Sequence, residues 1–159
     1  MKKRAQFQLS FGMIFSIFLI IATIGIAVYA ILHFIQINDM TICVEFYENL
    51  KQKVDTAWNA DMVKTNFSNR VPSKTQFVCF GNVSLTAPKN KDREILSEIK
   101  SFYRGKNNLF FYPAGSCGEQ FSFNVPHIKT DNFFCIENKK GKVTVEISKN
   151  IEDALVKLK

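Results

Sequence analysis

The 159-residue chain has the length of one ordinary domain, but its charges are unevenly distributed. It carries 21 Lys plus Arg against 14 Asp plus Glu, a net charge of +7, and no charged side chain lies between Arg4 and Asp39. This uncharged run of 34 residues excludes a fully soluble protein, and the net charge of only +4 on residues 39–159 excludes a strongly polybasic nucleic-acid binder. With 47% hydrophobic residues the chain is not intrinsically disordered. We therefore expect a small domain tethered to a membrane.

Residues 6–38 are predicted to form a transmembrane helix. The run from Leu9 to Ile37 is apolar with few polar interruptions, and about 20 apolar residues suffice to cross the hydrocarbon core. The basic triplet Lys2–Arg4 precedes it, and cytoplasmic flanks of membrane helices are enriched in Lys and Arg. We therefore expect the basic leader, residues 1–5, in the cytoplasm and residues 39–159 as an extracytoplasmic domain of a single-pass protein of the cell membrane.

A secretory signal cleaved after Ala30 is the first alternative. Val28-Tyr29-Ala30 satisfies the small-residue rule for such a site. However, the apolar run before Ala30 is longer than a usual signal core, and the hydrophobic pattern continues over residues 31–35. The sequence favours a helix that is kept as an anchor.

The segment from Lys2 to Phe11, KKRAQFQLSF, resembles the leader of archaeal type IV pilins, the class III signal peptide. In that family a few basic residues and a Gly or Ala precede a cytoplasmic cleavage point, and the hydrophobic helix follows. The resemblance implies processing between Ala5 and Gln6 and homo- or hetero-oligomers formed through the retained helix. Ser10 occupies the fifth mature position, where many pilins carry Glu. A plain signal anchor, whose basic residues only set topology, is the alternative.

The apolar pattern continues beyond Asn38 as an amphipathic one. Apolar side chains recur at steps of three to four residues, at Ile42, Phe46, Leu50, Val54 and Ala57-Trp58. No Gly or Pro interrupts residues 27–61. We predict one helix that leaves the bilayer and continues as a stalk to about Val63.

The rest of the domain is predicted to form strands, one short helix and a terminal helix. We predict a loop near Pro72 and a short helix over Asp92–Tyr103, and we interpret the tail, Ile151–Leu158, as a terminal helix rather than a further strand. The predicted strands are Thr75–Val83, Leu109–Tyr112, Phe121–Val125, Phe133–Glu137 and Val143–Ser148.

These elements predict an α+β fold, in which the long N-terminal helix packs on an antiparallel sheet of about 4–5 strands with one short helix. Type IV pilins, which the leader resembles, are built in the same way. The adjacent pairs Phe110/Phe111 and Phe133/Phe134 must point to opposite faces of this sheet. At least one member of each pair therefore needs cover from a second layer or from a partner.

All four cysteines, Cys43, Cys79, Cys117 and Cys135, lie beyond the predicted membrane helix. An even number in an extracytoplasmic domain favours disulfides, and we expect Cys43 with Cys79 and Cys117 with Cys135. Buried free thiols are the alternative. A zinc site is disfavoured because no Cys-x-x-Cys pair occurs and neither His lies at ligand spacing from a Cys.

Two further motifs allow chemistry without requiring it. Asn66-Phe67-Ser68 and Asn82-Val83-Ser84 are candidate glycosylation sites, although two such triplets are close to the number expected by chance. Cys117, with His127 as a base, could form a nucleophilic pair, but a Gly-flanked loop that carries a disulfide explains the same residues.

The sequence thus favours a non-enzymatic membrane-anchored protein, a pilin-like subunit or minor pilin that acts by assembly or adhesion. Its expected partners are the lipid bilayer and other helices. We assign no catalytic residue, cofactor, metal, nucleic acid or small-molecule substrate. The alternatives are a monomeric, signal-anchored binding module and, less favoured, a cysteine-dependent extracytoplasmic enzyme.

Overall fold

The computed structural model describes residues 11–159 and has the predicted α+β fold. The chain divides into two compact units, Met1–Gln36 and Ile37–Lys159, and helix α1 contributes to both. The two helices of the described part are α1 (Phe11–Trp58) and α2 (Asn90–Phe102). Its strands are β1 (Val63–Arg70), β2 (Phe77–Phe80), β3 (Leu109–Tyr112), β4 (Ser122–Phe123), β5 (Ile128–Lys129), β6 (Phe134–Glu137), β7 (Lys142–Lys149) and β8 (Val156–Leu158).

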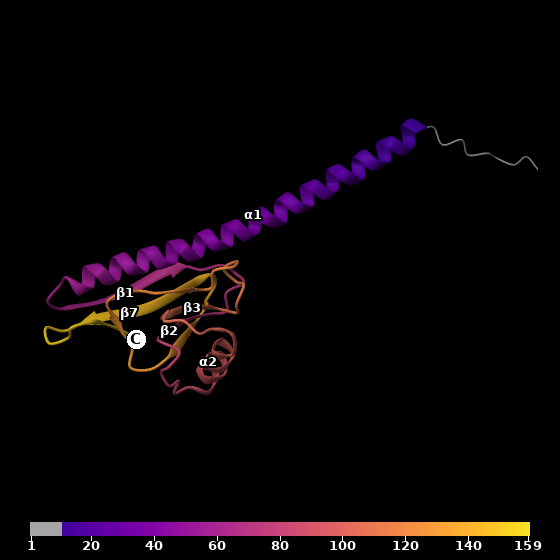
Figure 1. Ribbon diagram of the computed structural model, residues 1–159. Coiled ribbons are helices and arrows are strands. Elements are labelled where there is room, and N and C mark those ends of the chain that lie inside the picture. Colours follow the sequence, from indigo (N-terminus) through magenta and orange to yellow (C-terminus); the bar gives the residue numbers. More distant parts are fainter. Residues whose placement is uncertain (1–10) are drawn as a thin grey trace, which may run out of the picture. The chain divides into compact units, whose positions relative to one another are not determined.

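The strands form two sheets where the sequence predicted one. The first has the order β1-β7-β8-β5 and the second β4-β3-β2-β6. All pairs are antiparallel except β5 with β8. In the second unit α1 runs beside β1, and α2 lies on the other side of the sheets from α1 (Figure 1).

The amphipathic part of α1 supplies one wall of the main core. Phe46, Leu50, Val54 and Ala57 are buried, as the periodicity predicts, and Cys43 is buried in place of Ile42. The Phe46 ring meets Phe67 of β1 and Phe111 of β3 edge-to-face, at centroid distances of 5.2 and 5.5 Å. These contacts bind α1 to both sheets.

Helix α1 ends at Trp58, five residues before the predicted limit near Val63. The Lys149 ammonium donates to the carbonyl oxygen of Trp58, the last residue of the helix, at 2.6 Å, and to that of Ala60 in the following turn at 2.9 Å. The Asn59 side-chain amide also donates to the Asp55 carbonyl oxygen at 2.9 Å. Such bonds satisfy the acceptors that a helix terminus leaves open.

The second sheet is covered on both faces, as the paired phenylalanines require. Phe111 lies in the core that faces α1, whereas Phe110 lies in a second core with residues of α2. Phe133 belongs to that second core and its neighbour Phe134 packs against the first. The cover comes from within the chain.

The secondary structure of two segments of the domain was predicted wrongly. Residues 63–70 form strand β1, where we predicted the end of a helix and a loop, and Val156–Leu158 form strand β8, where we predicted a helix. In the tail, Val156 and Leu158 are buried while Ile151 is 73% exposed, so the burial alternates as in a strand. Pairing with β7, which was predicted, orders both segments.

Candidate functional surfaces

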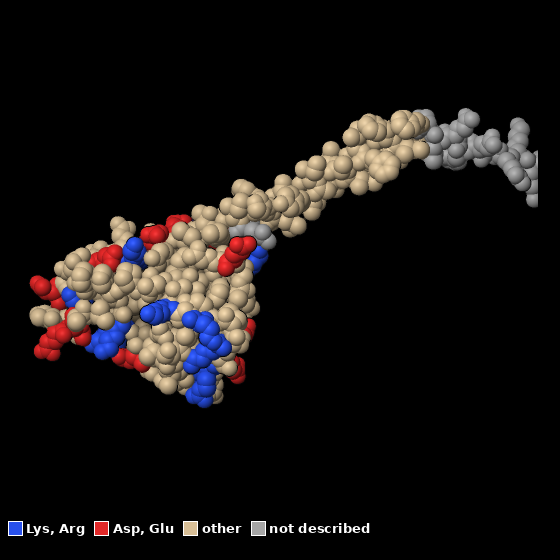
Figure 2. Space-filling view, in the orientation of Figure 1, with Lys and Arg blue, Asp and Glu red and all other residues tan. Residues whose placement is uncertain are grey.

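The part of α1 in the first unit is an exposed apolar helix. From Phe11 to Ile35 its large apolar side chains are between 40% (Ile14) and 84% (Phe11) exposed. Figure 2 shows no Lys, Arg, Asp or Glu on the visible face of the described part of this unit. Of the described helices, α1 alone is long and apolar enough to cross a membrane.

The hydroxyl groups on this segment bond within the helix itself. Ser16 Oγ donates to the Gly12 carbonyl oxygen at 2.8 Å, and Thr23 Oγ1 donates to the Ile20 carbonyl oxygen at 2.9 Å. A polar group without a partner is costly in hydrocarbon. These bonds remove that cost, so the hydroxyls are compatible with a lipid environment.

An aromatic pair lies near the end of this segment. The rings of Tyr29 and His33, one helical turn apart, are stacked with centroids 6.1 Å apart and 4° between their planes. Tyrosine is enriched where a membrane helix meets the headgroups.

All four cysteines form disulfides, but in a different pairing from the one we expected. Cys43 bonds to Cys117 and Cys79 bonds to Cys135. The first joins α1 to the loop after β3, and the second joins β2 to β6, where the two cysteines are direct cross-strand partners. The sequence allowed three pairings and carried no information about which strands are neighbours.

The disulfide removes the nucleophile that the enzyme alternative needs. The Cys117 sulfur is bonded to Cys43, and the residue is fully buried. The His127 ring lies instead against Trp58 and Asp55. The structure therefore does not bring Cys117 and His127 together as a thiol and its base.

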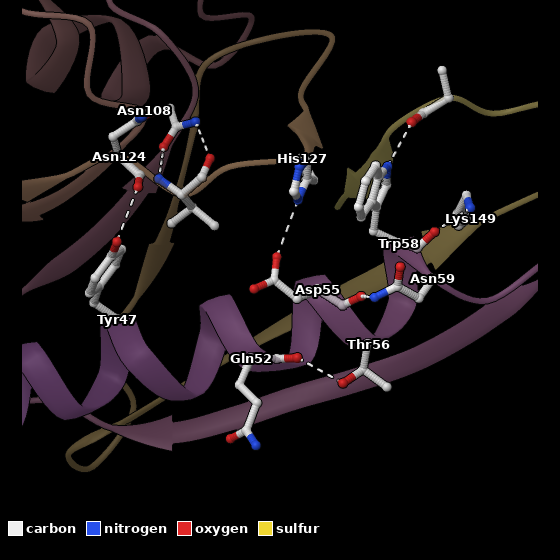
Figure 3. Close-up of polar contacts among 12 residues, drawn as sticks. Tyr47, Gln52, Asp55, Thr56, Trp58, Asn59, Asn108, Asn124, His127 and Lys149 are labelled. Carbon is white, nitrogen blue, oxygen red and sulfur yellow. Dashed lines mark hydrogen bonds and ion pairs between the residues drawn. The ribbon is translucent and has the colours of Figure 1, made fainter.

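A polar cluster at the end of α1 was not found from the sequence. The His127 and Trp58 rings stack with centroids 3.8 Å apart, and His127 Nδ1 lies 3.2 Å from Asp55 Oδ1 (Figure 3). The Trp58 indole N–H donates to the Ala154 carbonyl oxygen at 3.2 Å. The cluster fastens the segment before β5 and the turn before β8 to α1, so its contacts account for it as a structural device.

A groove lies between the start of α1 in the second unit and the end of β1. It has a volume of about 620 Å³. Its lining residues are Asn38, Ile42, Glu45, Ser68, Asn69, Arg70 and Lys142. The groove could not be found from the sequence, because Arg70 and Lys142 are 72 positions apart and Arg70 lies on β1, a strand that was not predicted.

The remaining candidate residues differ in accessibility. Asn66 is exposed in the middle of β1, whereas Asn82 is partly buried and its side-chain oxygen accepts the Ser84 N–H at 2.8 Å. The processing candidates Ala5 and Gln6 lie outside the described residues. Across residues 11–159 no group of three or more His, Cys, Asp and Glu could hold a metal ion.

Comparison of the chain with models of protein families, with curated protein sequences and with solved structures finds no match.

Proposed function

We propose that this chain is a single-pass protein of the cell membrane, with its leader in the cytoplasm and residues 39–159 outside. It serves there as a pilin-like subunit or minor pilin that assembles or adheres through α1. The observation that carries this proposal is the difference between the two parts of helix α1. The N-terminal part of α1 exposes apolar side chains, and its C-terminal part is built into a disulfide-bonded α+β domain.

The length of the exposed segment supports the anchor. Residues 11–37 rise about 40 Å as an α-helix, against about 30 Å for the hydrocarbon core. The excess of about 10 Å can be taken up by tilt or by the headgroup layers. Two disulfides support the extracytoplasmic placement of the domain, because disulfides persist outside the reducing cytosol.

The surface of this segment supports assembly. Its side chains are apolar around the whole circumference, so neighbouring helices can pack against it in any direction. Gly12 and Ser16, one turn apart, provide a small-residue face on which a second backbone can approach closely. An assembly built in this way needs no chemistry from the domain.

Mass spectrometry of the mature N-terminus tests the proposal. We expect the chain to begin at Gln6, and the Ala5→Leu variant to keep its leader because the small residue before the cut is lost. Ala27→Leu, the same exchange within the helix, is the matched control and should be processed normally. An intact Met1 in the wild type would contradict leader processing, and a start at Ile31 would contradict the anchor.

Position 10, the fifth after the proposed cut, is Ser and not the Glu that many pilins carry. This difference favours a second candidate, a monomeric anchored binding module. Cross-linking of a cysteine placed at Ile17, on the exposed apolar segment, separates the two. Assembly through α1 predicts cross-linked dimers and higher species in the native membrane. A monomeric anchor predicts cross-linking no greater than that of the same variant diluted into excess lipid.

A further inference from the structure

The groove beside the membrane-proximal end of the domain holds two cations without an ion-pair partner. Arg70 of β1 and Lys142 of β7 are direct cross-strand partners. Like charges directly opposite each other on a sheet repel. Three pairs of Lys with a carboxylate and the contact of His127 with Asp55 occur among the described residues, and neither Arg70 nor Lys142 takes part in one. A bound anion would relieve this repulsion.

The other polar groups of the groove can donate hydrogen bonds. The Asn69 side-chain oxygen already accepts the Arg70 N–H at 2.8 Å, so its amide NH₂ is the part available to a ligand. Thr144 Oγ1 donates to Ser68 Oγ at 2.9 Å, which leaves the Ser68 hydroxyl proton to donate. Glu45 is the one carboxylate that lines the groove, against two cations. The site is therefore rich in donors and positive overall.

The groove lies where the chain leaves the apolar segment. Its first lining residue, Asn38, directly follows Ile37, the last residue of the apolar run. From Asn38 to Glu45 the helix rises about 10 Å, which is similar to the depth of one headgroup layer, about 5–8 Å. By its position along the chain, the α1 side of the groove therefore begins within about one headgroup depth of the apolar run.

A neighbouring ion pair fixes this end of the domain. Lys74 Nζ lies 2.9 Å from Asp39 Oδ2, and Asp39 is 9% exposed. The pair ties the loop after β1 to the first turn of α1 in the second unit. Arg70, four residues before Lys74, lines the same groove as Asn38.

We propose that this groove binds the phosphate of an anionic lipid headgroup, and this rests on the membrane anchor of the proposed function. The planar Arg70 guanidinium can donate two parallel hydrogen bonds to phosphate oxygens, and the Lys142 ammonium adds a point charge. Ser68 and Asn69 supply neutral donors. A volume of about 620 Å³ lies within the range of sites that hold small organic groups.

The test uses the full chain in lipid nanodiscs that contain phosphatidylcholine with a minority of phosphatidylglycerol. Native mass spectrometry counts the lipids retained by the released protein. We expect phosphatidylglycerol to be enriched over its share in the disc. Removal of one cation by Arg70→Gln or Lys142→Gln should reduce this enrichment about fivefold, and Glu45→Gln should increase it.

The matched control is the double variant of Lys51 and Lys53 to Gln. It removes the same charge as the double variant of Arg70 and Lys142, but about 20 Å farther along α1 from Asn38. A basic leader, where it is retained, attracts anionic lipid equally in every variant, so the comparison is made between variants. Equal enrichment in the two double variants would overturn the proposal. The Arg70 and Lys142 side chains are exposed, so their replacement should not lower the unfolding midpoint below that of the wild type. A midpoint at or above the wild-type value shows that these variants are folded.

Two further measurements distinguish a lipid headgroup from free phosphate and test the membrane anchor separately from the groove. Loss of the enrichment when inorganic phosphate replaces chloride at equal ionic strength would assign the groove to free phosphate and overturn the lipid. Failure of the wild-type chain to enter discs of phosphatidylcholine alone would overturn the anchor and, with it, the lipid as a ligand. Entry without any enrichment would overturn the groove proposal while leaving the anchor intact.

Discussion

At the scale of single residues, the hydroxyl group of Tyr112 connects β3 to α2. It donates to Glu98 Oε2 at 2.6 Å. This hydrogen bond, aided by burial and by the charges of Glu98 and Glu94, raises the pKa of Tyr112 above its usual value of 10.0. Because the folded pKa is the higher one, the contact contributes its full stability below about pH 10 and loses it as the pH rises through the folded pKa.

We expect Glu98→Gln to lower the pKa of Tyr112 toward its usual value, because the negative acceptor is replaced by a neutral one. At neutral pH the cost should be at most about 1 kcal/mol, since the pair is solvent-exposed. Titration of tyrosinate absorbance measures the shift, and Tyr112→Phe identifies its signal among the four tyrosines. An unchanged titration in Glu98→Gln would contradict this role of the contact.

His127 combines a favourable ring contact with an unfavourable backbone. Its φ of 61° lies in the left-handed region, which costs a residue with a Cβ about 1–2 kcal/mol. The ring stacks on Trp58 and meets Asp55, and these contacts hold the backbone there. The sequence showed only that a histidine was present.

We expect His127→Ala to destabilise the domain by about 1–2 kcal/mol, because it loses the ring contacts and keeps the backbone cost. His127→Gly should be less destabilising by about 0.5–1 kcal/mol, since glycine adopts positive φ freely. Denaturant unfolding in detergent, followed by the fluorescence of the only tryptophan, measures both.

Lys140 provides the control, since its φ is 56° and no ring contact involves it among the described residues. Lys140→Gly should be more stable than Lys140→Ala by about the same amount as for His127, about 0.5–1 kcal/mol. Neither variant should show the loss of stability that comes from removing the His127 ring contacts. If His127→Gly were less stable than His127→Ala, the backbone at this position would not be a cost to the fold.

At the scale of elements, the two disulfides hold different layers of the domain. Cys43–Cys117 closes a separation of 74 residues and fastens α1, whereas Cys79–Cys135 closes 56 residues and staples β2 to β6. We expect non-reducing peptide mapping to recover these two linkages, and replacement of either pair by alanine to cost about 2–5 kcal/mol. Peptides that link Cys43 to Cys79 would contradict the arrangement of α1 over the sheets.

Most helices and strands could be predicted because the spacing of their own apolar side chains indicates them. The strand Leu109–Tyr112 was predicted to the residue, and the burial of Phe46, Leu50 and Val54 follows their helical spacing. Residues 63–70 could not be predicted as a strand, since Phe67 is the only buried side chain among them. Their order comes from pairing with β7, which is a long-range contact.

The surfaces were harder to predict than the helices and strands, because they depend on contacts between residues far apart in the sequence. The groove depends on Arg70 and Lys142 being opposite each other, and this register exists only once β1 is formed. The disulfide pairing likewise depends on β2 and β6 being neighbours. By contrast, the apolar segment of α1 is a local property of consecutive residues, and its helix was predicted over the described residues from Phe11 onward.

At the scale of the whole second unit, the second sheet is shared by two cores. Phe111 contributes to the core that contains α1, and Phe110, the preceding residue on β3, contributes to the core that contains α2. Both side chains are at most 1% exposed. Loss of β3 from the sheet would therefore open both cores at once, which predicts a single cooperative unit.

We expect Phe110→Ala and Phe111→Ala each to lower the free energy of unfolding by about 3–5 kcal/mol and to shift one common transition. Two probes follow the opposite sides of the sheet: the fluorescence of Trp58 at the end of α1, and hydrogen exchange of the amides in α2. The two probes should shift together in each variant, because the residue lost from one core belongs to a strand that the other core also needs. If Phe110→Ala released α2 while the Trp58 transition stayed in place, the two cores would be independent units, and α2 would be a detachable layer on a domain held by α1.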